Sequence, residues 1–218
     1  MNRFIVSLIL ILVGSCMVSS QLGKRMSDEK GREAINNFLS RIQGAQTGQI
    51  ISIDDGAVVQ AFPFDRFYVL SYRRYPVAPA LPESLAYNNL LVVHADEKVE
   101  FIRDPSALEA FFRSQLRPVT AELQARHSVK AWLRLSQEFQ QDGFFQFSTP
   151  ESGLLVVTER GVMRASGKAE VGSDYGNSGE IFISLSFNPA GRLTDERNSD
   201  LDDFDLWSGI RKRRLRDW

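Results

Sequence analysis

The sequence has one cysteine, Cys16, among 218 residues. A lone thiol cannot form a disulfide within its own chain, and every segment after residue 16 is without thiolate chemistry. The fold therefore has to be stable through packing and hydrogen bonding alone. Such a chain fits a bacterial envelope protein better than a small, disulfide-rich secreted domain.

The sequence motifs of common enzyme and metal-binding classes are also missing. The chain contains no Gly-x-Ser-x-Gly nucleophile elbow, His-Glu-x-x-His or Cys-x-x-Cys pair, phosphate-binding Gly-rich loop or EF-hand loop. A Ser/His/Asp triad assembled from distant residues would leave no such pattern, so that arrangement stays open. From the sequence we predict no catalytic, cofactor-binding or metal-ligating residues.

Histidine is scarce, with two residues in the chain. His94 ends a predicted strand, and Asp96, Glu97 and Glu100 follow it closely, a set of side chains that can bind a divalent metal. A hairpin turn at Asp96 and Glu97 accounts for those two carboxylates without a metal. We interpret His127 as a residue on the surface of a helix.

An excess of one charge is absent, since 26 basic and 27 acidic residues give a net charge of −1. A near-neutral chain has no general attraction to nucleic acid, so we predict no nucleic-acid partner. Residues 194–218, however, hold an acidic run and then a basic end, with Trp207 and Trp218 interleaved. Such a tail is typically solvated; contact with anionic headgroups, or a fold of the basic end onto the acidic run, is the alternative.

No hydrophobic run is long enough to cross a bilayer. After Arg3, the apolar stretch from Phe4 to Val13 is about ten residues, which as a helix reaches ~15 Å, half of a bilayer core. A positive start, a short apolar centre and small residues beyond it are typical of an export signal. We therefore predict a signal peptide over residues 1–20 and a mature protein that folds outside the cytoplasm.

The end of this signal, Leu12-Val13-Gly14-Ser15-Cys16, resembles the lipobox of bacterial lipoproteins. The resemblance implies that Cys16 carries a diacylglyceryl group and anchors the chain to a membrane, with ~0.8 kcal/mol contributed by each buried methylene. Aspartate after the cysteine signals inner-membrane retention in enteric lipoproteins. Met17 stands there, so the resemblance favours the outer membrane where one exists. Cleavage after Ser20 is the alternative and would release a periplasmic or secreted protein.

The mature chain is expected to begin with a linker and a helix. Residues 21–27 predict a short flexible linker, and Ser27 caps a helix with Asp28 and Glu29 in its first turn. Gly44 follows this helix as a natural end signal. The helix has one apolar face, made of Ile35, Phe38, Leu39 and Ile42.

Strands follow this helix. Residues 50–53 and 57–62 flank Asp54-Asp55-Gly56, a sequence that favours a tight turn, so we predict a hairpin. Three more strands are predicted, the last two as a second hairpin, at residues 67–72, 90–94 and 99–102.

Helices and then strands fill the rest of the chain. Asp104-Pro105 begins a helix and Pro118 ends it, with a further helical stretch to Gln141. In the predicted strand 163–171 the buried positions are small, which predicts that a helix packs closely on that face. The strands of this part are expected at residues 144–147, 154–158, 163–171 and 181–187.

The order of helix, strands, helices and strands predicts an α+β fold, with an antiparallel, curved sheet packed against helices. In architecture alone this is similar to cystatin-like and nuclear-transport-factor-like folds. We predict a single α+β domain over residues 28–193 and a charged C-terminal tail over residues 194–218.

Two segments are candidates for binding. Residues 73–84 carry three prolines at a spacing of three, which is typical of a stiff, extended connection and alternatively of a lid or docking loop. Phe144, Phe145 and Phe147 place aromatic side chains on both faces of one strand, as in a doubly buried strand or a pocket wall.

Two functions are compatible with these features. The first is a non-catalytic, lipid-anchored envelope protein that binds a partner protein or a small ligand near a membrane. The second is a soluble secreted or periplasmic enzyme, hydrolase-like, with a site that no motif reveals. A pocket with convergent polar groups of shifted ionisation would favour the enzyme. An apolar pocket, or an exposed aromatic or edge-strand surface, would favour the binding protein.

Overall fold

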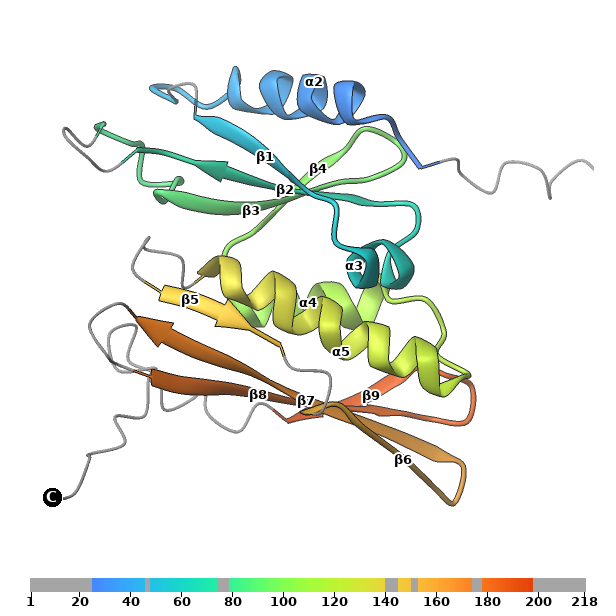
Figure 1. Cartoon of the computed structure of the whole chain (residues 1–218). Helices are drawn as coiled ribbons and strands as arrows, with labels where there is room; N and C mark the ends of the chain where they lie inside the picture. The colour runs from blue at the N-terminus through green and yellow to red at the C-terminus, as the bar shows by residue number, and fades with distance from the viewer. Residues whose placement is uncertain are drawn as a thin grey trace, which may run out of the picture.

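The computed structural model of the chain describes residues 25–45, 48–73, 79–139, 145–149, 153–173 and 178–197. The predicted signal peptide with Cys16, residues 21–24 of the predicted linker and residues 198–218 of the predicted tail lie outside this part. The described residues form four layers, which Figure 1 shows from top to bottom. They are a helix, a first sheet, a layer of helices and a second sheet.

Both sheets are antiparallel throughout. The first sheet has the order β1 (Gln49–Ile53), β2 (Arg66–Ser71), β3 (Asn88–Val93) and β4 (Val99–Ile102). The second sheet has the order β5 (Phe145–Ser148), β7 (Val162–Ser173), β8 (Ser178–Phe187) and β9 (Leu193–Arg197), and β6 (Leu155–Glu159) also pairs with β7. The α+β prediction is confirmed, with two sheets where the sequence led us to expect one.

Helix α2 (Asp28–Leu39) covers the outer face of the first sheet (Figure 1). Ser27 caps it as predicted, because its hydroxyl accepts from the backbone N–H of Lys30. Ile35 and Leu39 point into a core that also holds Tyr68 of β2. Met26, in the segment expected to be linker, is buried in the same core.

The predicted hairpin around residues 54–56 is wrong, because the chain there enters a helix, α3 (Gly56–Ala61). Asp55 acts as an N-cap: its carboxylate accepts from the backbone N–H groups of Ala57 at 2.8 Å and Val58 at 3.1 Å. The apolar side chains of α3 then pack against the central helices instead of pairing as a strand.

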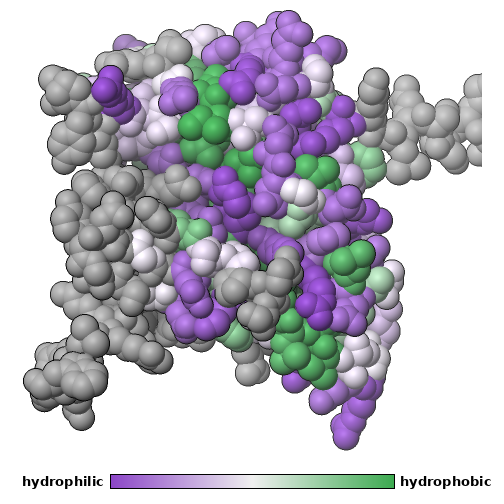
Figure 2. Space-filling model, viewed as in Figure 1, coloured by the Kyte–Doolittle hydropathy of each residue, from purple (hydrophilic) through white to green (hydrophobic). Residues whose placement is uncertain are grey.

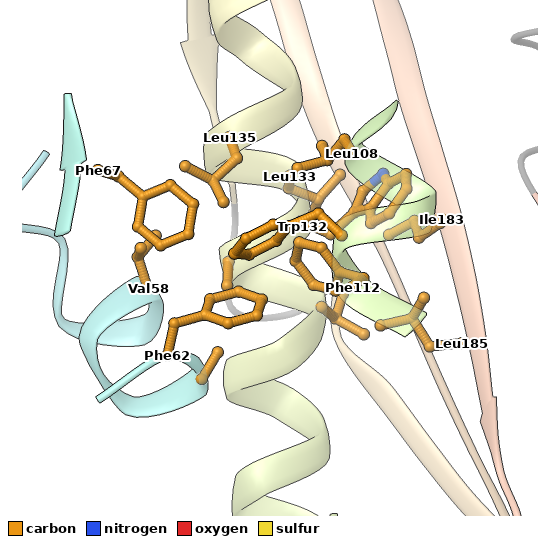
Figure 3. Packing of buried hydrophobic residues seen from close by; sticks show 14 of the residues in the cluster. Val58, Phe62, Phe67, Leu108, Phe112, Trp132, Leu133, Leu135, Ile183 and Leu185 are labelled. Carbon is orange, nitrogen blue, oxygen red and sulfur yellow. The ribbon is translucent and has the colours of Figure 1, made fainter. Parts of the chain in front are cut away.

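Helices α3, α4 (Pro105–Gln115) and α5 (Glu122–Ser136) fill the layer between the sheets, and the 3₁₀ helix η1 (Gln137–Phe139) continues α5. Figure 3 shows the ring of Phe112 of α4 between Phe62, at the end of α3, and the indole of Trp132 of α5. The ring centroids of Trp132 and Phe112 lie 4.8 Å apart. One continuous core therefore joins the two sheets.

The predicted close packing on the strand of small residues is confirmed. Ala165, Gly167 and Ala169 of β7 are buried beneath α5. A Cβ atom at Gly167 would lie 2.6 Å from Cγ1 of Val129, so the helix and the sheet approach each other as closely as glycine permits. The second sheet then extends into the predicted tail, since β9 ends at Arg197.

Candidate functional site

A pocket of about 480 Å³ opens between the segment that leads into β3 and the end of η1. One wall comes from the proline-containing segment that precedes β3, and the other from the end of η1. The lining residues are Pro79, Ala80, Leu81, Pro82, Glu83, Leu85, Ala86, Tyr87, Asn88, Glu138 and Phe139. Residues 79–84 of the predicted stiff connection therefore form part of a concave surface.

Glu138 places a buried carboxylate in this pocket. Its side chain is 2% exposed. Arg134, one helical turn earlier, forms an ion pair with its Oε1 atom. Asn88 Nδ2 donates to the backbone oxygen of Glu138 at 2.7 Å and lies 3.3 Å from Oε2. A carboxylate this deeply buried is tolerated because both of its oxygens have partners.

A second asparagine holds the wall of the pocket in place. Asn89 is buried, and its Nδ2 donates to the backbone oxygens of Leu70 at 3.0 Å and Ala86 at 2.6 Å. Its Oδ1 accepts from the N–H of Ala86 at 2.8 Å. The amide thus ties the segment before β3 to strand β2. The pocket is preformed on this side, which lowers the entropy cost of binding a ligand.

The rest of the lining mixes apolar side chains with polar groups. Leu81, Leu85 and Phe139 supply hydrophobic surface, and two prolines restrict the backbone of the wall. The volume is in the range of small-molecule sites, and the lining offers both apolar surface and polar groups to a ligand. Among the described lining residues none is a histidine, serine, threonine, cysteine or lysine.

The second polar cluster surrounds His94, at the opposite end of β3. His94 Nδ1 lies 2.8 Å from Asp65 Oδ1, and His94 Nε2 lies 3.1 Å from Glu100 Oε2. The imidazole also stacks on Phe111 of α4, with ring centroids 6.1 Å apart. Burial raises the pKa of the Asp65 carboxyl, and the hydrogen bond from His94 counteracts part of that rise.

Both ring nitrogens of His94 are therefore engaged with carboxylates. No serine, threonine or cysteine of the described residues bonds to this imidazole, and no group of three or more described His, Cys, Asp or Glu residues is arranged to hold a metal. The cluster joins the ends of three strands of the first sheet, and we interpret it as a structural brace.

The sequence pointed to part of this cluster. Glu100 was expected close to His94, and the structure brings the two together. Asp96 and Glu97 are turn residues, as predicted: Asp96 accepts from the N–H of Lys98, and Glu97 has a positive φ of 67°. Asp65 was missed, since it precedes His94 by 29 residues. His127 lies half-buried on α5, apart from the cluster.

Little in the sequence indicates that these residues line a pocket. Arg134 and Glu138 have the i, i+4 spacing of a helical ion pair, which usually marks a solvated surface. Only the fold reveals that this carboxylate is buried. Cys16, the predicted lipidation site, lies outside the described residues, as do Phe144 and the side chain of Phe145.

Comparison of the chain with protein-family models, with curated proteins and with solved structures finds no match. Across the residues that the structure describes, none of the helices combines the length and the apolar character that a membrane crossing requires.

Proposed function

We propose that this chain is a non-catalytic cell-envelope lipoprotein, anchored through Cys16, whose α+β domain binds a small ligand in the pocket at Glu138. The pocket itself is the observation that carries the proposal. A volume of about 480 Å³ fits a small organic molecule and is too small for a folded partner. The ligand is amphipathic, because Leu81, Leu85 and Phe139 line the pocket together with polar groups such as Asn88.

The polar groups of the pocket favour binding over catalysis. The Glu138 carboxylate is bonded to Arg134 and Asn88, so it is held in one position. A general base instead needs an accessible lone pair directed at the proton that it removes. Glu138 thus supports the pocket wall, and the half-buried Asn88 is the better placed of the two to meet a polar group of the ligand.

The position of the N-terminus suits a lipid anchor. Two contacts attach the first described residues to the domain. The guanidinium of Arg25 lies 3.7 Å from the Asp54 carboxylate, and the backbone oxygen of Met26 accepts from Arg66 at 2.5 Å. The eight residues 17–24 then form the linker between the domain and Cys16, and fully extended they span at most ~28 Å. An anchored domain would thus stay close to the membrane, with α2 and the first sheet nearest the anchor.

The hydrolase-like enzyme remains the alternative. It would use the Asp65–His94 pair, whose 2.8 Å contact resembles the orienting half of a triad. Glu100 bonds to the nitrogen that would have to meet a nucleophile, so the binding protein is the better-supported proposal.

Ligand binding is tested with two matched variants. Ala86→Trp fills the pocket from its exposed rim, and Ala190→Trp places the same side chain on an exposed turn beside the second sheet. The probe is an organic extract of the envelope of the cells that make the protein, with unfolding temperature as the readout. We expect the extract to stabilise the parent and Ala190→Trp, and not Ala86→Trp. Equal stabilisation of all three proteins would exclude the pocket as the site.

A further inference from the structure

The outer face of the second sheet carries exposed apolar side chains. Along β7 and β8 the inward positions are buried against α5, while outward positions face solvent. Leu155 and Val157 of β6 are 60% and 40% exposed, and Phe182 of β8 is 42% exposed. Figure 2 shows the hydrophobic surface gathered over β6, near the lower end of the molecule.

The strand register places basic side chains between these apolar ones. Arg164 of β7 pairs with Val157 on one side, and Lys168 of β7 pairs with Phe182 on the other. The face therefore has apolar side chains on both sides of β7, and Glu170 and Glu180 lie on it beside Lys168, at 3.9 and 2.7 Å. Arg164 makes no ion pair with another described residue, whereas Lys168 lies 2.7 Å from Glu180.

Two of the other edge strands, β1 and β9, each accept a hydrogen bond from an arginine of a neighbouring helix. Arg32 of α2 donates to the oxygen of Ile50 in β1 at 2.6 Å, and Arg113 of α4 donates to the oxygen of Thr194 in β9 at 3.2 Å. Natural sheets cover exposed edges in this way. Within the described residues, no element covers the outer face beside β6.

We propose that residues 198–210 of this same chain dock on the outer face of the second sheet. The chain leaves β9 at Arg197, which pairs with Ser184, two residues from Phe182. From β9 to β6 the distance is three strand spacings, ~14 Å. The ten residues from Arg197 to Trp207 can reach up to ~33 Å, so Trp207 can contact β6.

The composition of this segment suits the face. Its first part places aspartates among Leu201 and Phe204 and can pass Arg164 on β7, which makes no ion pair with a described residue. An apolar group follows and meets Leu155 and Val157 on β6. The acidic residues are Asp200, Asp202, Asp203 and Asp205, and the apolar group is Leu206, Trp207 and Ile210.

A membrane is the weaker candidate for this face. The second sheet is the layer farthest from α2, and α2 directly follows the predicted anchor (Figure 1). A linker of at most ~28 Å would keep α2 near the bilayer. The outer face of the second sheet, on the opposite side of the domain, would then face away from the membrane. The face is therefore available to the tail whether or not the chain is anchored.

Tryptophan fluorescence of the mature chain with Cys16→Ser and Trp218→Phe tests the proposal. Two tryptophans then remain: Trp132, which is fully buried, and Trp207. Acrylamide quenching reports on Trp207. Leu155→Lys disrupts the proposed contact, and Arg164→Glu repels the acidic run. Leu123→Lys, at a leucine of α5 that is 62% exposed, is the matched control.

We expect Trp207 to be protected from acrylamide in the parent and in Leu123→Lys. In Leu155→Lys and Arg164→Glu we expect loss of protection and a red shift of emission to that of indole in water. The unchanged emission of Trp132 verifies that each variant is folded. Full quenching of Trp207 in the parent, or protection that Leu155→Lys leaves intact, overturns the proposal. Protection that disappears on dilution also overturns it, because a second copy of the chain would then supply the contact.

Discussion

Gly31 of α2 lies directly over the hydroxyl of Tyr68 in β2. A Cβ atom at Gly31 would lie 2.0 Å from Tyr68 Oη and 2.7 Å from Cζ, and Tyr68 is fully buried. The hydroxyl donates to the backbone oxygen of Asp28 at 3.3 Å, in the first turn of the same helix. This contact sets the distance between α2 and the first sheet, and with it the position of the segment that leads to the predicted anchor.

Gly31→Ala is therefore expected to destabilise the protein, although alanine favours helices by about 1 kcal/mol over glycine. Overpacking against the buried Tyr68 ring costs ~1–3 kcal/mol and outweighs that gain. Gly56→Ala is the matched control, because a Cβ there meets nothing within 4 Å and Gly56 is the first residue of α3. Chemical denaturation measures both. Equal stabilities of the two variants would contradict the close contact.

Tyr68 also predicts a loss of stability at high pH. Burial raises the pKa of its hydroxyl from 10.0 to about 12. Because the folded-state pKa is above the unfolded value, the contribution of Tyr68 is complete below pH 10 and is lost as the pH rises through about 12. We expect the free energy of unfolding of the parent to fall relative to that of Tyr68→Phe across this range. Parallel pH curves for the two proteins would argue against a buried hydroxyl.

Trp132 is fully buried in the core, yet its indole N–H has no hydrogen-bond partner among the residues that the structure describes. A buried, unpaired donor costs ~1–3 kcal/mol. Trp132→Phe removes this donor and keeps an aromatic ring but leaves a smaller cavity than alanine does, so we expect it to cost clearly less than Trp132→Ala. Trp132→Ala should cost ~3–5 kcal/mol through the cavity that it leaves. Thermal or chemical unfolding distinguishes the two, and similar losses would show that the N–H is satisfied.

His94 is expected to contribute to stability. Replacement by alanine leaves the buried Asp65 carboxylate without its hydrogen-bond donor, which costs ~1–3 kcal/mol at pH 7. The matched control is His127→Ala on α5, where no such pair is lost; we expect a change within about 0.5 kcal/mol. If the two alanine variants unfold alike, the His94 cluster is not a brace.

Most helices and strands could be predicted from the sequence, because capping residues and apolar spacing are set by residues close together in the chain. Ser27 and Asp104 cap their helices, and the small residues of β7 face α5, as expected from spacing alone. Segment 56–61 was misinterpreted because Asp55 followed by glycine begins both a hairpin turn and a short helix. Contacts with α5, distant in sequence, favour the helix there.

The polar clusters could not be predicted in the same way. Asn88 and Glu138 lie 50 residues apart, and Asp65 and His94 lie 29 residues apart. Each pair forms only when two elements pack together, and neither partner carries a local pattern that marks it as buried. The division into two sheets likewise depends on the helices that separate them.

Native mass spectrometry of the protein, purified from its own cells in mild detergent, tests the proposed function most directly. We predict a chain that begins at Cys16 with added acyl mass and carries a non-covalently bound small molecule, which Ala86→Trp loses and Ala190→Trp retains. A bare chain that begins at Gln21, with no bound mass in the parent, would contradict both the anchor and the ligand-binding pocket.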